Sequence, residues 1–150
     1  MELQDVVPKI AKDVIGTWKL VSWTFKNEHG KEVNYFGTNP AGILMYTESG
    51  YMSVHIMKEN RTKFKSEGMY DGTSEEITEA FKTYFAYFGK FIESAPGVLR
   101  HTVEGGTFPN WLGNVEERYG KIMGNKLVLS TPPIHTEGRD IVFDVVWQRV

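Results

Sequence analysis

Short runs that alternate between apolar and polar residues make up much of the chain after Gly16. The run over residues 17–26 is rich in β-branched and aromatic side chains, which suit the pleated surface of a strand. Runs over 42–47 and 51–57 are separated by residues 48–50, a short glycine-containing connection of the kind that hairpins use. The pattern predicts that these two runs pair as antiparallel strands.

The second half of the chain continues as extended runs joined by short turns. Gly124 and Asn125 stand between two of these runs and predict a tight hairpin, because both residues tolerate a positive φ. The runs number about eight in all, at which a closed barrel is just wide enough for its own side chains or one small ligand. The later strands are expected at 90–94, 98–104, 115–123, 126–131 and 140–150.

Two stretches have helical spacing instead. The apolar residues before Gly16 recur at helical intervals, which predicts a short leading helix. Thr73 stands three positions before Glu76, the capping-box pattern that marks a helix start. The apolar stripe that follows predicts a longer helix near residues 74–88, with an aromatic face against the rest of the protein. The leading stretch contributes Val6, Val7, Ile10, Val14 and Ile15, and the stripe contributes Ile77, Ala80, Phe81, Tyr84, Phe85 and Phe88.

These elements favour a mainly β fold, a single antiparallel up-and-down barrel formed by residues 1–150. A length of 150 residues suits one core, since a chain of this size buries roughly two-thirds of its unfolded surface. An α/β enzyme fold would need strands and helices to alternate along the chain, and they do not. A cone-shaped α+β fold of the nuclear-transport-factor kind is the closer alternative, but such a fold opens with long helices.

Composition and charge narrow the choice of partner. Phe, Tyr and Trp make up 13% of the chain, and such rings suit either a bulky core or a lined pocket. The net charge is −2 and the basic side chains are scattered, so no basic stripe is available for a phosphate backbone. We therefore expect no nucleic-acid partner.

The chain contains no cysteine, which excludes disulfides and sulfur-ligated zinc and fits a reducing cytoplasm. The stretch before Gly16 lacks both a basic start and an unbroken apolar run, so it resembles neither a signal peptide nor a membrane anchor. We expect a cytoplasmic protein with no membrane partner. The oligomeric state stays open, a homo-oligomer included.

Residues 16–18 read Gly-Thr-Trp and resemble the Gly-x-Trp signature of lipocalins, and residues 147–149 read Trp-Gln-Arg. The resemblance implies that Trp18 closes the base of the barrel and that Arg149 packs across it. A guanidinium over an indole face adds about 0.5–2 kcal/mol of cation–π stabilisation.

A longer resemblance, to the bacterial and fungal lipocalin-like domain family of calycin type, covers nearly the whole chain. Several blocks occur in the order typical of that family, which implies the fold more securely than it implies an activity. The blocks are GTWKLVS at 16–22, GYMSV at 50–54, HTVEG at 101–105, FPNWLG at 108–113 and LSTPP at 129–133.

His101 is the leading candidate for chemistry inside the barrel. It alternates with Leu99 and Val103 along one predicted strand, so all three share a face that the apolar neighbours mark as inward. A buried imidazole there could orient a ligand's carbonyl or hydroxyl, move a proton, or bond a neighbouring group within the core. Glu104 could act as a general base in a dry cavity, or form an ion pair with Arg118 at the rim.

Residues 109–111 (Pro-Asn-Trp) are expected to form a loop that closes one mouth of the barrel, with Trp111 as its lid or anchor. Asn110 could donate to a ligand or bond its own backbone in the turn. Tyr84 and Phe88 could present an aromatic wall to the cavity or belong to the plain core. No histidine has a second at metal-ligand spacing, and no phosphate or dinucleotide fingerprint is present, so we expect neither a metal nor another cofactor.

The leading hypothesis for function is a binding module that holds a small, largely apolar or aromatic molecule in the barrel cavity. The alternative is a cyclase or isomerase of polyketide-like metabolism, in which the same cavity positions a substrate while His101 or Glu104 shifts a proton. A third option is an interaction protein whose barrel interior is simply core. The expected ligand contacts are His101, Asn110, Trp111, Arg118, Tyr84 and Phe88.

Overall fold

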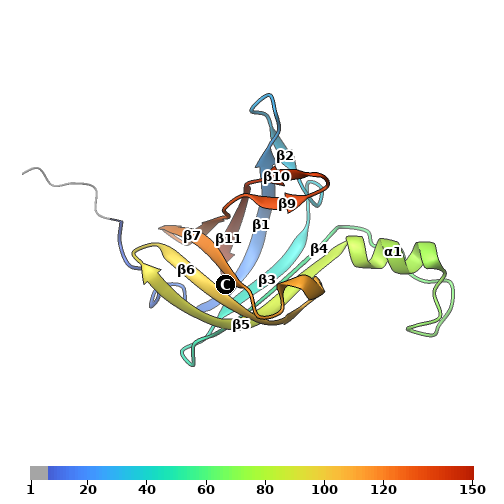
Figure 1. Cartoon of the computed structure of the whole chain (residues 1–150), viewed down its shortest axis with the longest axis horizontal. Coiled ribbons are helices and arrows are strands. Elements are labelled where there is room, and N and C mark those ends of the chain that lie inside the picture. Colours follow the sequence, from blue (N-terminus) through green and yellow to red (C-terminus); the bar gives the residue numbers. More distant parts are fainter. Residues whose placement is uncertain (1–6) are drawn as a thin grey trace, which may run out of the picture.

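Antiparallel strands dominate residues 7–150, which the computed structural model describes (Figure 1). Eight of them form one closed barrel: β1 (Gly16–Lys26), β3 (Ala41–Tyr46), β4 (Tyr51–Met57), β5 (Tyr84–Ala95), β6 (Val98–Gly106), β7 (Val115–Met123), β8 (Lys126–Ser130) and β11 (Phe143–Arg149). The sheet closes because β1 pairs with β3 along one edge and with β11 along the other. The predicted mainly β, up-and-down barrel is confirmed.

Four shorter elements decorate this barrel. Strand β2 (Glu32–Asn34) extends the sheet beside the end of β1, while β9 (Ile134–Thr136) and β10 (Arg139–Ile141) form a separate hairpin. A 3-10 turn, η1 (Pro109–Trp111), lies between β6 and β7. Figure 1 shows β2, β9 and β10 together at one end of the barrel.

The side-chain alternation expected for half-buried strands is present. On β4 the side chains of Met52, Val54 and Ile56 are buried and that of His55 is exposed, as the pattern predicts. Both predicted hairpins also form, and the glycines at their turns, Gly50 and Gly124, have φ values of 88° and 63°. Positive φ at these positions has almost no steric cost for glycine.

The base of the barrel is sealed by Trp18 and Arg149, which are cross-strand partners on β1 and β11. Trp18 is fully buried, and its indole N–H donates to the carbonyl of Val14 at 2.8 Å. The Arg149 guanidinium lies 4.1 Å from the centroid of the Trp18 ring and donates to the carbonyls of Asp13 and Ile15. Arg149 therefore ties the end of the chain to both the base tryptophan and the segment that precedes β1.

Over residues 7–15 the leading segment is a plug rather than the predicted helix. Residues 11–14 form a single turn, and Val6 lies outside the described residues. The Glu93 carboxylate accepts the backbone N–H groups of Ile10 and Ala11, which leaves the segment docked on β5 with Ile10 and Val14 buried under the barrel. Burial alone would raise the pKa of Glu93, but the hydrogen bonds from Gly97, Ile10 and Ala11 hold it below its ordinary value.

The longer helix is shorter than predicted. Helix α1 (Ser74–Lys82) begins with the expected capping box, in which Thr73 and Glu76 each accept the other's backbone N–H. It ends at Thr83, and residues from Tyr84 onward belong to β5, paired with β4 on one side and β6 on the other. Pairing with two neighbouring strands favours the extended conformation for these residues, although their apolar spacing fits a helix.

The expected packing of this helix is also wrong. No residue of α1 is buried, and Ile77 and Phe81 are 48% and 56% exposed. In Figure 1 α1 projects away from the barrel, so its apolar stripe has no strand beneath it over most of its length.

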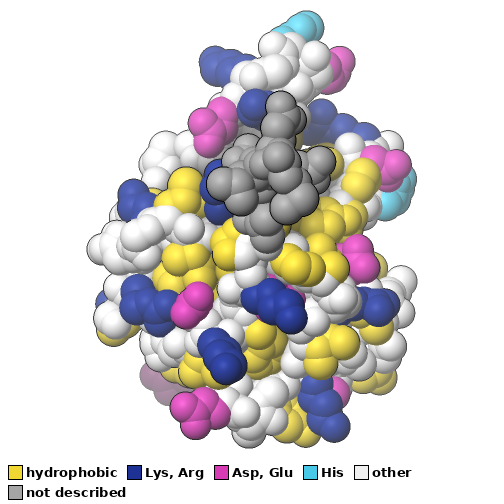
Figure 2. Space-filling view, turned by 90° about the vertical axis from the view of Figure 1, so that its left-hand side faces the viewer, with side chains coloured by type: hydrophobic (Ala, Val, Ile, Leu, Met, Phe, Trp, Pro, Cys, Tyr) yellow, Lys and Arg dark blue, Asp and Glu magenta, His cyan; other side chains and the backbone are white. Residues whose placement is uncertain are grey.

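Charged side chains of both signs are interspersed on the face drawn in Figure 2. The Arg100–Glu117 ion pair between β6 and β7, with 3.8 Å between the charged atoms, is half-exposed and contributes about 0–1 kcal/mol. The barrel is therefore held by closure and apolar packing rather than by surface ion pairs.

Replacing Arg149 with methionine is expected to lower the free energy of unfolding by about 1–3 kcal/mol, because the cation–π contact and two hydrogen bonds are lost together. Urea denaturation measures this loss. The control is Lys126→Met, an exposed charge on β8, whose effect should stay within about 0.5 kcal/mol. Equal effects of the two substitutions would show that the base contact adds nothing.

Candidate functional site

A pocket of about 460 Å³ enters the barrel at the end opposite Trp18. Strand β5 runs from the pocket to the base of the barrel. Tyr84 and Phe85 at its start line the pocket, while Glu93 near its end accepts a hydrogen bond from the leading segment at the base. The volume falls in the range of small-molecule sites, which are mostly apolar with a few polar groups. Aromatic rings form much of the wall, including Trp23, Tyr35, Phe36, Phe85, Trp111 and Phe143.

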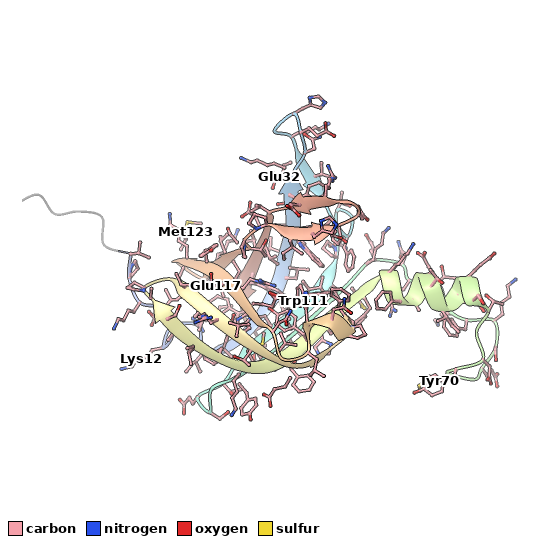
Figure 3. All side chains as sticks on the ribbon, viewed as in Figure 1. Lys12, Glu32, Tyr70, Trp111, Glu117 and Met123 are labelled. Carbon is pink, nitrogen blue, oxygen red and sulfur yellow. The ribbon has the colours of Figure 1, made fainter. Side chains whose placement is uncertain are left out.

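Segments outside the barrel strands complete the mouth of this pocket. Phe108 and Trp111 reach it from around η1, Phe81 and Lys82 from the end of α1, and residues 134–137 from β9 and its turn. Figure 3 labels Trp111 beside the 3-10 turn η1, of which it is the last residue.

Trp111 is packed as well as placed at the mouth. Its ring meets those of Phe85 and Tyr87 edge to face, with centroids 5.7 and 5.6 Å apart. Such edge contacts add about 0.5–1.5 kcal/mol each beyond the area they bury. Trp111 is therefore an anchored wall of the pocket.

His101 lies between two tyrosines inside the barrel. Its Nε2 is 2.7 Å from the hydroxyl of Tyr46 on β3, and its Nδ1 is 2.7 Å from the hydroxyl of Tyr87 on β5. His101 and Tyr87 line the pocket, whereas Tyr46 lies behind them and is 1% exposed.

Burial governs the protonation of this trio. Burial, and secondarily the charge of Arg118, lowers the pKa of His101 well below its ordinary value. Burial raises the pKa of Tyr46 and of Tyr87, against a smaller lowering by Arg118. All three side chains are therefore neutral near pH 7.

Arg118 on β7 brings the positive charge into the pocket. It is 6% exposed and its guanidinium carbon lies 5.9 and 5.8 Å from the ring centroids of Tyr87 and Trp111. One of its nitrogens donates to the carbonyl of Glu117, 2.7 Å away. Within residues 7–150 no carboxylate oxygen comes within 4.0 Å of it.

Glu116 is a neighbour of the site, outside the pocket lining, that the sequence reasoning missed. It is directly opposite His101 in the β6–β7 register and is half-buried. Burial raises the pKa of its carboxyl, against the opposing influence of Arg118. Its spacing of two from Arg118 along a strand is the signal that places both on one face.

The structure gathers four of the predicted ligand contacts and separates the rest. His101, Trp111 and Arg118 line the pocket, and Tyr84 lies at its rim with its hydroxyl bonded to His55 on the outer surface. Phe88 and Asn110 are exposed and do not line the pocket.

The proposed role of Glu104 inside a cavity is wrong. Glu104 is exposed, because it stands three positions from His101 on β6 and therefore on the opposite face. The same parity excludes the predicted ion pair with Arg118, and the cross-strand pair that forms on the outside joins Arg100 to Glu117. Glu104 is therefore not placed to act as a general base inside the barrel.

Metal and membrane features can be stated for the described part of the chain. Among residues 7–150, no three His, Asp or Glu side chains are grouped as metal ligands. The helices of that part are too short or too polar to cross a membrane.

A closed antiparallel barrel, sealed at one end by a Trp–Arg pair and entered by an aromatic pocket at the other, defines the small lipocalin-type barrels. A family model described as a lipocalin-like domain matches residues 15–150, and the chain belongs to this family. A curated relative from Aspergillus oryzae is named 4'-hydroxy-3'-methoxypropiophenone carrier protein ppsC. It is 30% identical over 107 residues, which cover 66% of this chain and 96% of the relative.

The buried neutral imidazole makes stability depend on pH. In the unfolded chain His101 takes up a proton below about pH 6.5, whereas in the folded protein its lowered pKa keeps it neutral. Its contribution is therefore complete above about pH 6.5 and is lost as the pH falls. The difference in unfolding free energy between wild type and His101→Gln should shrink by up to about 1.4 kcal/mol per pH unit below that point.

Urea denaturation of both proteins between about pH 7.5 and about pH 5.5 measures this difference. Subtracting the two unfolding free energies removes the contributions of the other titrating groups, which both proteins share. A difference that stays constant across this interval would contradict the buried neutral state of His101.

Proposed function

We propose that this protein binds a small, largely apolar, aromatic molecule in the barrel pocket and serves as its intracellular carrier. The observation that carries the proposal is the pocket itself, whose aromatic walls surround a few polar groups at one position. The relative named as a carrier of a substituted propiophenone supports a ligand of the same general kind. The absence of cysteine from the chain supports a cytoplasmic location.

The cyclase or isomerase alternative has less support. Glu104 is outside the barrel, and both ring nitrogens of His101 are occupied by tyrosine hydroxyls. A general base must reach the proton that it removes, directly or through one water. Holding a ligand needs no such group, so binding is the function that the site supports best.

Binding is tested with N-phenyl-1-naphthylamine, a neutral aromatic probe whose fluorescence rises in an apolar site. The wild-type protein should bind it with a stoichiometry of about one, because the barrel pocket of about 460 Å³ has the size of a site for one small molecule. In Val54→Phe the new ring points into the pocket from β4, so the dissociation constant should rise at least about tenfold, or about 1.4 kcal/mol.

The matched control is Ile92→Phe, which adds a ring on the outer face of β5, where Ile92 is 61% exposed. Its affinity should stay within about twofold of wild type, and circular dichroism should show both variants folded. Absence of binding to wild type, or equal binding by Val54→Phe, would count against the proposal.

A further inference from the structure

The inner wall of the pocket presents hydrogen-bond donors and a positive charge to whatever enters it. Tyr87 on β5 and Arg118 on β7 both line the pocket, and both are more than nine-tenths buried. Their arrangement specifies the polar group of a ligand more closely than the aromatic walls do.

The direction of the hydrogen bonds follows from counting partners. Tyr46 is 1% exposed, and within the described residues its hydroxyl has one hydrogen-bond partner, Nε2 of His101. A buried hydroxyl hydrogen without an acceptor is costly, so Tyr46 donates to Nε2. Neutral His101 then carries its proton on Nδ1 and donates it to the oxygen of Tyr87.

This series of hydrogen bonds supplies no acceptor for the hydroxyl hydrogen of Tyr87. His101 donates to this hydroxyl oxygen, and Arg118, the other side chain that bonds it, has N–H donors and no acceptor. Because the side chain of Tyr87 lines the pocket, its O–H is free to donate to a ligand atom there. Successive donation from Tyr46 through His101 also polarises this O–H and strengthens it as a donor.

Arg118 reinforces the same requirement. A guanidinium has five N–H donors, and one hydrogen bond to Glu117 is formed within the described residues. A buried cation is costly unless it is paired. Glu116 offsets the charge only in part, since its oxygens stay beyond 4.0 Å of Arg118.

We propose that the ligand carries an anionic oxygen, as a carboxylate, sulfonate or ionised phenol, held jointly by the Tyr87 hydroxyl and the Arg118 guanidinium. Its aromatic portion packs on Trp111 and Phe85 toward the mouth. The inference rests on the proposed binding function and adds the class of ligand to it.

The test compares two probes that share one anilinonaphthalene frame. 8-Anilino-1-naphthalenesulfonate carries a sulfonate, and N-phenyl-1-naphthylamine lacks it. Wild type should bind the sulfonate at least about tenfold more tightly, since charge-assisted hydrogen bonds are roughly twice as strong as neutral ones. The Val54→Phe variant should weaken both probes, which places both in the pocket.

Arg118→Met should abolish the preference for the sulfonate, measured as the ratio of the two dissociation constants within the same variant. Arg118→Lys keeps the charge and should keep a reduced preference, which covers the case in which the methionine variant fails to fold. Tyr87→Phe removes the second donor and should weaken the sulfonate about fivefold. The control Lys121→Met removes an exposed charge from the outer surface of β7 and should leave the preference unchanged.

The outcomes separate the two proposals. If the neutral probe binds and the sulfonate shows no preference, or if the preference survives in Arg118→Met, the anion site is wrong and the binding function stands. If neither probe binds to wild type, both proposals are wrong.

Discussion

Closure between β1 and β11 is the constraint on which the rest of the structure depends. Pairing of the first barrel strand with the last leaves the barrel without a free sheet edge and separates an inner from an outer face on every strand. The same pairing sets Trp18 against Arg149 and so seals one end. Closure creates the inner face of the sheet, and the side chains of His101, Arg118 and Glu116 lie on that face because of it.

Much of this barrel could be predicted because period-two alternation is a local property. The hairpin of β3 and β4 and the turn at Gly124 follow from a few adjacent residues. The apolar stripe from Ile77 to Phe88 has helical spacing and therefore predicted a helix over its whole length. Its second half is a strand instead, because β5 pairs with β4 and β6. Such pairing depends on residues far away in the chain, so no window around Tyr84 reports it.

The site could be predicted only where the alternation of inward and outward positions along one strand determines where a side chain lies. Parity places His101 inward, and applied to Glu104 it would have placed that residue outside, since three positions separate them. The tyrosines that bond His101 come from 55 and 14 residues earlier in the chain, on β3 and β5. Their meeting depends on strand register around the barrel, which the sequence does not state locally.

A barrel sealed at one end has one route for exchange. The base is closed by Trp18, Arg149 and the leading segment held on Glu93, whereas the mouth is lined by η1, the turn after β9 and the end of α1. None of the mouth segments contributes a strand to the closed barrel. Under the proposed binding function, a ligand would enter and leave past these peripheral segments, so substitutions there should change its residence time more than they change the resistance of the barrel to unfolding.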